Sequence, residues 1–266
     1  MGTIWLIAAG TFGEATRRRT LLVFLLVALG IILATATIAA FQPHSDTLII
    51  KALGLGVIGF AGAFISIILG INLIPTEIER RTIYTILSKP VHRYQFLCGK
   101  FLGGLMTVLA SVFAMSFVFL LLFVIKERGF DAEVLAVAKG ILLIIFEVMI
   151  VTAVAVFFSV FLSPFVNFFL TFAVFLLGNM SSVTAALADP TSDPTHPKSA
   201  MVTNTFKVIH AIIPNFAEFN VQNPILDPHM QINNQAQFVE LHITYALAFT
   251  AILLILGSLI FERREV

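Results

Sequence analysis

Glu147 is the residue with the most distinctive chemistry, because it is the only acidic residue well inside a long apolar run, Gly140–Leu162. An ionisable side chain at the centre of a bilayer costs about 2.5–3.5 kcal/mol on insertion scales and marks a functional site by default. Glu147 could relay a proton, bind a cation or contact a polar substrate. The competing interpretation is a neutral acid that is hydrogen-bonded to a neighbouring helix. Asn179, near the end of the next apolar run, is a second polar candidate for a transport pathway.

Imidazole and thioether side chains gather in one polar section, and both are copper-type ligands. They are His196, Met201, His210, His229 and Met230, with His44 in another polar segment. No two of them stand at a tight ligand spacing such as His-x-x-x-His. We therefore predict no metal site.

Motifs for catalysis are also missing from the sequence. Gly99-Lys100 has no glycine-rich turn before it, so it does not form a phosphate loop. The sequence has no Gly-x-Ser-x-Gly nucleophile elbow and no His-Glu-x-x-His zinc motif. We expect no enzyme activity and no cofactor bound by this chain. Cys98 is the only cysteine, which excludes an intrachain disulfide.

The composition indicates a membrane protein. Of 266 residues, 59% are hydrophobic and 12% are charged, and the mean hydropathy is +1.00, whereas soluble domains are about a quarter charged. Six apolar runs reach the roughly 20 residues that cross a bilayer as a helix. They are Leu21–Phe41, Ala52–Ile74, Phe101–Ile125, Gly140–Leu162, Pro164–Leu187 and Leu241–Phe261. We predict an all-α polytopic membrane protein with six transmembrane helices in one domain, residues 1–266.

Two further segments have helical periodicity without the length to span. Residues 2–19 predict an amphipathic interfacial helix before the first span. Residues 189–240 form the longest polar section, and apolar residues repeat at helical spacing between Met201 and Ile213, just before Pro214. This second pattern predicts an interfacial or re-entrant helix in an extracytoplasmic loop.

The distribution of basic residues predicts the orientation. With the N-terminus inside, the inner segments hold ten Lys and Arg residues and the outer segments hold six. The ten are Arg17, Arg18, Arg19, Arg80, Arg81, Lys89, Arg93, Lys100, Arg263 and Arg264. We expect both termini in the cytoplasm, with residues 75–100 on the same side.

Residues 75–100 are the polar stretch around which the other segments are organised. Thr76 followed by Glu79 is typical of a capping box, which predicts a helix start at Thr76. Pro90 restricts the preceding backbone, so this helix should end at about Leu87. A helix of this length lies beside a membrane rather than across it, and it can be held by another protein.

This stretch resembles the first cytoplasmic loop of ABC type-2 exporter permeases. The matching residues are Glu77, Glu79, Thr82, Ile86-Leu87, Lys89-Pro90, Arg93 and Gly99-Lys100. Arg81 departs from the pattern, because many relatives have Gly there. Weaker similarity continues to the closing Phe261-Glu-Arg-Arg264.

The resemblance implies a coupling helix that docks on a separate ATP-binding-cassette ATPase, which binds ATP and Mg. The ATPase-coupling residues would be Glu77, Glu79, Arg80, Arg81, Thr82, Lys89, Pro90 and Arg93. It also implies a second copy of the chain or a related permease as partner, the cytoplasmic (inner) membrane as location, and export as the direction. No nucleic-acid partner is expected. Peptides, lipids, drugs and metal-linked cargo all remain open as substrates.

A stripe of small residues follows one side of the second span. Gly62, Ser66 and Gly70 stand four residues apart, a spacing that lets helix backbones approach closely. Two interpretations remain open, a seam at the pathway or dimer contact and packing within the chain.

Two other functions stay open beside the permease. A membrane scaffold or receptor would need no ATPase partner. An intramembrane enzyme would use Glu147, but no second acid or metal motif lies within a span.

Overall fold

The structure is a computed structural model that describes residues 2–41, 47–79, 92–127, 132–189, 199–219 and 234–263. Every regular element among these residues is a helix. The helices are α1 (Gly2–Ala15), α2 (Arg19–Phe41), α3 (Thr47–Gly70), α4 (Pro75–Glu79), α6 (Arg93–Glu127), α7 (Ala132–Ser159), α8 (Pro164–Asn179), α9 (Ser181–Ala188), α10 (Ala200–Ile212) and α11 (Gln235–Arg263).

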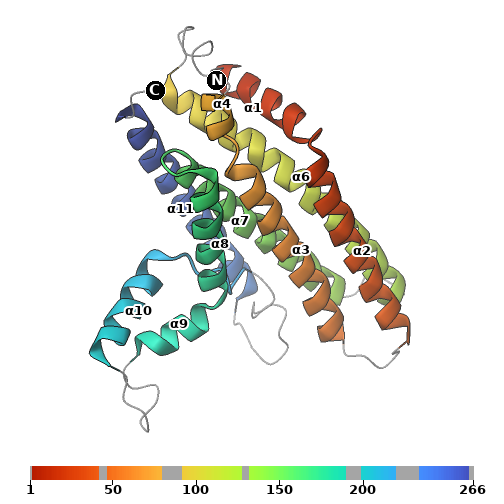
Figure 1. Cartoon of the computed structure of the whole chain (residues 1–266). Coiled ribbons are helices and arrows are strands. Elements are labelled where there is room, and N and C mark those ends of the chain that lie inside the picture. The colour runs from red at the N-terminus through yellow and green to blue at the C-terminus, as the bar shows by residue number, and fades with distance from the viewer. Residues whose placement is uncertain are drawn as a thin grey trace.

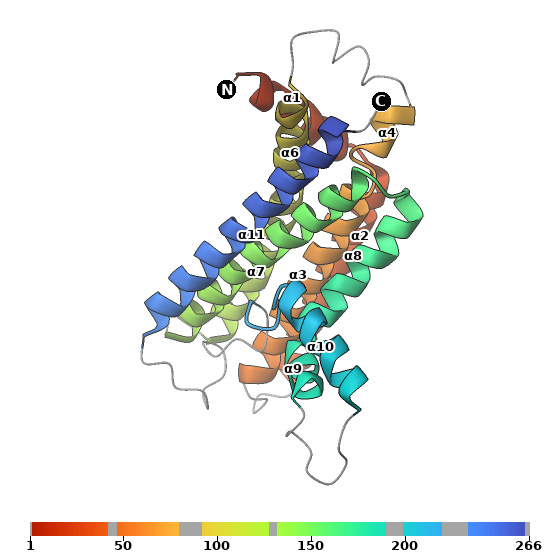
Figure 2. The ribbon, with the colours of Figure 1, turned by 90° about the vertical axis from the view of Figure 1, so that its left-hand side faces the viewer.

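The long helices lie side by side in an elongated bundle (Figure 1). The start of α1, the short helix α4 and the last turn of α11 gather at one end, which we name the α4 end. The hairpin of α9 and α10 lies at the opposite end, which we name the α10 end (Figure 2). The prediction of an all-α polytopic membrane protein is therefore confirmed.

Helix α7 forms the centre of the bundle and packs against α3, α6, α8 and α11. In the most apolar part of α7, 67% of the residues are buried. The corresponding share in α11, at the periphery, is 17%. The core is apolar, with Ile144, Val148 and Val151 of α7 all at most 1% exposed. A polar residue on α7, such as Glu147, is consequently enclosed by other helices rather than by lipid.

Four described segments are long and apolar enough to cross a membrane, and two bent pairs bring the total to as many as six. The four are residues 49–77, 93–126, 133–159 and 235–263, and the pairs are α1 with α2 and α8 with α9. Helix α6 has 35 residues, or about 52 Å at 1.5 Å per residue, so it extends well beyond a bilayer core of about 30 Å.

The fifth predicted span is not the continuous helix that its composition suggests. Helix α8 starts at Pro164, which suits a first helical turn because it lacks an N–H. It stops at Asn179, and α9 then leaves at an angle of 76°. The break frees the carbonyl of Gly178, which accepts a hydrogen bond of 3.0 Å from the backbone N–H of Phe216. A broken span needs such a substitute partner, because lipid supplies none.

Both short helices predicted outside the spans are present. Helix α1 packs along α6 and meets α2 at 68°, and its Trp5 and Leu6 are 63% and 75% exposed. An exposed Trp is typical of a helix at a membrane surface. Helix α10 pairs with α9 and ends before Pro214, as predicted. Its position relative to the bilayer stays a prediction.

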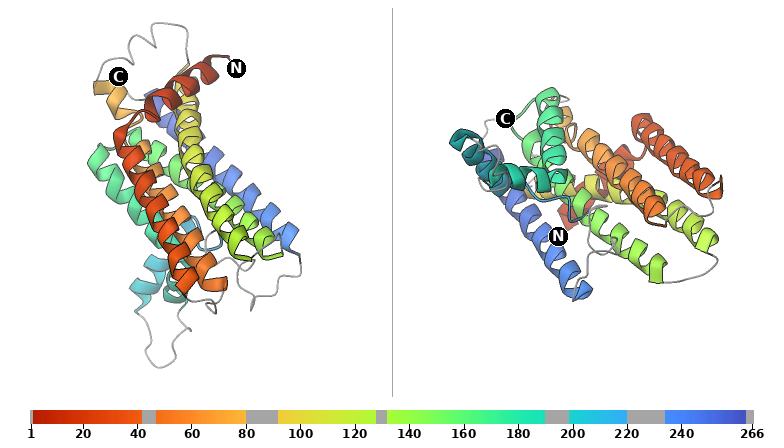
Figure 3. Two further views of the ribbon diagram at one scale, coloured as in Figure 1. Left: turned by 90° about the vertical axis from the view of Figure 1, so that its right-hand side faces the viewer. Right: turned by 90° about the horizontal axis from the view of Figure 1, so that it is seen from below.

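Large apolar side chains cover the outside of the bundle. Phe117 on α6, Phe165 on α8 and Leu259 on α11 are 70%, 73% and 52% exposed. In water such a surface would drive association, whereas lipid tails solvate it. Figure 3 shows the bundle from two further sides, with α2, α8 and α11 on its periphery.

Candidate functional site

The predicted coupling stretch begins with α4, and a charged pair ties α4 to α6. The Glu77 carboxylate accepts a hydrogen bond of 2.5 Å from the Lys100 ammonium. The two side chains are only 16% and 7% exposed, so water and salt screen this pair less than a surface pair. The pair therefore joins α4 to the first turns of α6.

The other predicted coupling residues are only partly described. Helix α4 starts at Pro75, one residue from the predicted start at Thr76, and Glu79 is its last residue. The continuation towards Leu87 falls outside the described residues. So do five of the predicted coupling residues, which are Arg80, Arg81, Thr82, Lys89 and Pro90.

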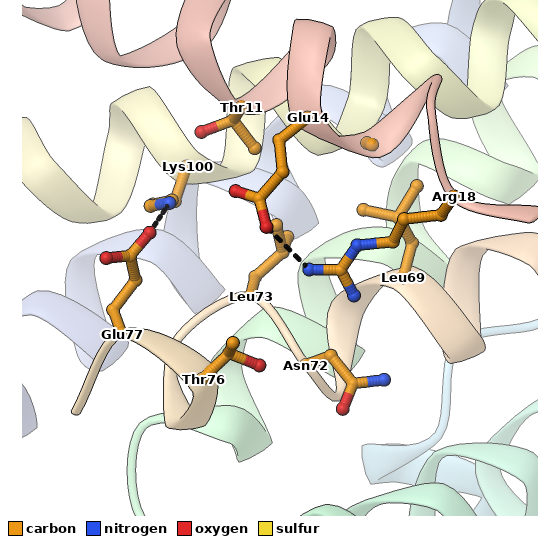
Figure 4. A pocket seen from close by; sticks show the side chains of 10 residues that line it. Thr11, Glu14, Arg18, Leu69, Asn72, Leu73, Thr76, Glu77 and Lys100 are labelled. Carbon is orange, nitrogen blue, oxygen red and sulfur yellow. Dashed lines mark hydrogen bonds and ion pairs between the residues drawn. The ribbon is translucent and has the colours of Figure 1, made fainter. Parts of the chain in front are cut away.

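A second charged pair lies beside the first, between α1 and α2 (Figure 4). The guanidinium of Arg18 donates to the Glu14 carboxylate at 3.1 Å. Both pairs face a small cavity of about 10 Å³, close to the space of one water molecule. Thr11 of α1 and Asn72, in the turn before α4, also line this cavity. Helices α1, α4 and α6 thus meet through polar side chains at the α4 end.

Arg93, also predicted to face the ATPase, contacts the last helix of its own chain. Its Nη1 donates to the backbone carbonyls of Phe261 and Glu262 at 2.8 and 3.3 Å. The guanidinium also lies 5.7 Å from the centre of the Phe261 ring. These carbonyls belong to the last turn of α11, where a cation is stabilised by the helix dipole. Arg93, in the second half of the coupling stretch, is consequently bound to α11 of its own chain. A contact of Arg93 with the ATPase stays a prediction.

The stripe of small residues on α3 faces α7. A Cβ added at Gly70 would lie 2.4 Å from Cβ of Ala155, and one at Gly62 would lie 2.9 Å from Val148. The Ser66 hydroxyl donates to the carbonyl of Gly62 at 2.8 Å and lies 3.5 Å from that of Val148. These contacts favour the interpretation of packing within the chain.

Glu147 and Asn179, predicted separately, are brought together by the fold. Asn179 Nδ2 donates to Glu147 Oε1 at 3.3 Å and to the Phe175 carbonyl at 3.1 Å. Glu147 is 0% exposed, and its Oε2 has no hydrogen-bond partner among the described residues. The pair lies where α8 breaks, so a polar contact holds the end of α8 against α7.

His242 and Glu218 form an ionisable pair that sequence reasoning missed. His242 Nε2 lies 2.5 Å from Glu218 Oε2, and His242 Nδ1 lies 2.7 Å from the Phe238 carbonyl. Two acceptor oxygens around one ring suit an imidazolium, which donates from both nitrogens. The centres of the Phe238 and Phe219 rings lie 4.1 and 5.2 Å away, and aromatic rings favour a cation. The missed signal was a histidine inside the apolar run Leu241–Phe261.

The comparison with known families agrees with this geometry. The family model of the ABC-2 family transporter proteins matches residues 5–266 of the chain. The chain belongs to this family. No curated protein sequence matches it.

Membership of the ABC-2 family settles the class of the protein. The chain is a multi-pass membrane permease of an ABC transporter, a transport subunit rather than a catalytic enzyme. Among the described residues, no group of three or more His, Cys, Asp or Glu side chains could hold a metal ion. Among the described residues, polar side chains gather at the charged junction of the α4 end and, nearer the α10 end, at the Glu147–Asn179 and His242–Glu218 pairs.

Proposed function

We propose that this ABC-2 family protein is the permease subunit of an ATP-driven exporter and that the α4 end docks on a separate ATPase subunit. The observation that carries the proposal is the buried Glu77–Lys100 pair, which fixes α4 to α6. The ATPase would bind ATP and Mg. This chain would convert the movements of the ATPase into a change in the arrangement of its transmembrane helices.

The junction offers two routes for movement into the bundle. The first is the contact of Glu77 with Lys100, which connects α4 to α6. Helix α6 is long enough to carry a displacement across the whole membrane. The second is the contact of Arg93, which connects the coupling stretch to α11. Packed helices move as rigid bodies between discrete arrangements, so closure of the ATPase would shift the population between an inward-open and an outward-open state.

The orientation that suits this function puts both termini and the α4 end in the cytoplasm. The count of ten inner against six outer Lys and Arg residues supports it. Two copies of the chain, or one copy with a related permease, would enclose the pathway in the inner membrane. Export of the cargo follows from the family resemblance.

The test exchanges the charges of the pair and measures coupling. The permease is purified with its ATPase subunit from membranes, and ATP hydrolysis is followed in lipid nanodiscs. Glu77→Gln leaves the buried Lys100 without its partner, so we expect permease-dependent ATPase activity to fall at least tenfold. The exchange Glu77→Lys with Lys100→Glu restores an ion pair and should recover part of this activity.

A matched control lies at the α10 end of the bundle, where the buried Lys51 pairs with Glu133. Glu133→Gln should leave the ATPase coupled. Equal losses in Glu77→Gln and Glu133→Gln would mean that both changes only destabilise the fold. Full coupling in Glu77→Gln would remove α4 from the mechanism, and a permease that retains no ATPase during purification would favour a scaffold or receptor.

A further inference from the structure

The buried Glu147 carboxyl lacks the partners that a charged group needs inside a membrane. Asn179 is its one hydrogen-bond donor among the described residues, at 3.3 Å, and Oε2 has none. No Lys, Arg or His side chain is paired with it in the described parts of the chain. An unpaired buried charge is so costly that such a group is neutralised instead. In this arrangement Glu147 therefore holds a proton.

A short segment between α10 and α11 covers the break in the fifth span beside this site. We name Pro214–Phe219 the strap. The N–H of Phe216 donates to the Gly178 carbonyl at 3.0 Å. A Cβ on Gly178 would lie 2.4 Å from the Phe216 ring and 2.5 Å from the Pro214 carbonyl. The strap is thus seated tightly on the residue that precedes Asn179.

The other end of the strap is held by charge. Glu218 accepts from His242 of α11 at 2.5 Å and from Asn215 at 3.1 Å. The Glu218 side chain is 46% exposed, whereas that of His242 is 7% exposed. The strap is therefore fixed on one side to α8 by a backbone bond and on the other side to α11 by the His242–Glu218 pair, in which Glu218 is half-buried. Release of the strap would uncover Gly178, the residue next to Asn179.

We propose that Glu147 is a proton-binding site of the transport cycle, filled while the strap covers the α8 break and emptied when the strap and α9 move away. The proposal rests on the proposed function, because the ATPase would drive that movement. On opening, the Glu147 O–H bond breaks, the carboxylate stays on α7 and the proton passes to water on the α10 side. On closing, the carboxylate takes up one proton from that side.

Other titratable groups near α7 are paired or remote, and Lys139 of α7 itself, eight residues before Glu147, contacts Gln235 of α11. Lys51 of α3 pairs with Glu133, 14 residues before Glu147 on α7, or about 21 Å along the helix. Lys100 of α6 pairs with Glu77 at the α4 end. Helix α8 carries no charged residue between Pro164 and Asn179. Helix α11 and the strap contribute Tyr245, His242 and Glu218, and His242 is paired with Glu218.

The sign of the pH effect follows from proton counting. The closed state binds one more proton at Glu147 than the open state does. Raising the outer pH therefore favours the open state, by up to about tenfold per pH unit per site. Lowering the outer pH favours the closed state. Glu147→Gln cannot release a proton, so it should remove the pH dependence that arises at this site.

The test is infrared difference spectroscopy on the permease in lipid nanodiscs at neutral pH. A protonated carboxyl gives a C=O band that shifts in D₂O, and glutamate labelled with ¹³C assigns the band to Glu without any substitution. We expect one such band in the resting permease, absent in Glu147→Gln and retained in Glu133→Gln. Absence of a protonated Glu band in the labelled wild-type protein would overturn the proposal even if Glu147→Gln failed to fold.

The second measurement follows the same band in the complex with its ATPase. Trapping with ATP and vanadate, verified by inhibited hydrolysis, should abolish the Glu147 band. A band that persists in a verified trapped complex would mean a permanently neutral structural acid and would also overturn the proposal. The resting-state band is measured on the permease alone, so failure of the ATPase to bind would count against the proposed function and not against the protonated site.

Discussion

At the scale of single residues, the packing of the bundle interior depends on small side chains as much as on large ones. Gly70 and Ala155 let α3 and α7 approach so closely that no further methyl group fits between them. Membrane helices gain little from hydrophobic exclusion when they associate, so close van der Waals contact and buried polar contacts carry the association. Glu147 with Asn179 is one such polar contact, between α7 and α8.

Substitution of Gly70 tests this packing. Gly70→Ala puts a methyl group 2.4 Å from Cβ of Ala155, and neither atom belongs to a flexible side chain. Overpacking of this kind costs about 1–3 kcal/mol, so we expect a lower unfolding temperature of the purified permease. Gly30→Ala on α2 is the matched control, because no atom lies within 4 Å of its added Cβ.

The control is expected to change the stability of the protein in the opposite direction. An Ala in place of an exposed helical Gly stabilises a helix by up to about 1 kcal/mol. A Gly70→Ala protein that melts at or above the wild-type temperature would contradict the described contact between α3 and α7.

At the scale of elements, α11 is joined to the rest of the chain at both ends. Arg93 binds the carbonyls of its last turn, and His242 binds the strap near its first turns. Between these points α11 packs along α7 and α6. A helix held in this way can pass a displacement from the coupling stretch to the strap without bending.

Removal of the Arg93 side chain should loosen the last turn of α11. Arg93→Ala deletes charge-assisted bonds to two carbonyls, and each bond of this type contributes about 1.5–3 kcal/mol. We expect amide hydrogen exchange in the last turn of α11 to rise at least tenfold, measured by mass spectrometry.

Lys139→Ala is the control, because Lys139 contacts Gln235 in the first turn of the same helix. It should leave exchange in the last turn unchanged. Arg93→Lys should show partial protection, since an ammonium keeps the charge and loses the planar geometry. Unchanged exchange in Arg93→Ala would show that other contacts hold this end of α11.

The same elements show what sequence could predict. Long apolar runs and Pro164 or Pro214 at helix boundaries predicted most helices to within several residues, because chain-local signals set them. The break after Asn179 was missed, since it depends on the strap, which follows about 35 residues later and takes up the freed Gly178 carbonyl. The Glu147–Asn179 contact, the Arg93 contact with α11 and the His242–Glu218 pair were missed for the same reason. Each joins segments distant in sequence, and the residue types alone do not determine the partner.

At the scale of the whole molecule, many of the described polar contacts lie at two levels of a largely apolar bundle. The α4 end gathers the Glu77–Lys100 and Glu14–Arg18 pairs (Figure 4). The strap and the α8 break gather Glu147, Asn179, Glu218 and His242. Long helices run between the two levels. This division suits a permease in which one end receives a mechanical input and the other end opens.

The central claim, that the α4 end is the docking surface for the ATPase, is tested most directly by site-specific photo-crosslinking. A photoreactive amino acid is placed at Glu79, the last residue of α4, and in a separate protein at Asn204, an exposed residue of α10 at the opposite end. Crosslinked partners in intact membranes are identified by mass spectrometry. We predict that Glu79 captures an ATP-binding-cassette subunit and that Asn204 does not. An ATPase captured from Asn204, or none from Glu79 while the purified complex contains one, would contradict both the docking surface and the proposed orientation.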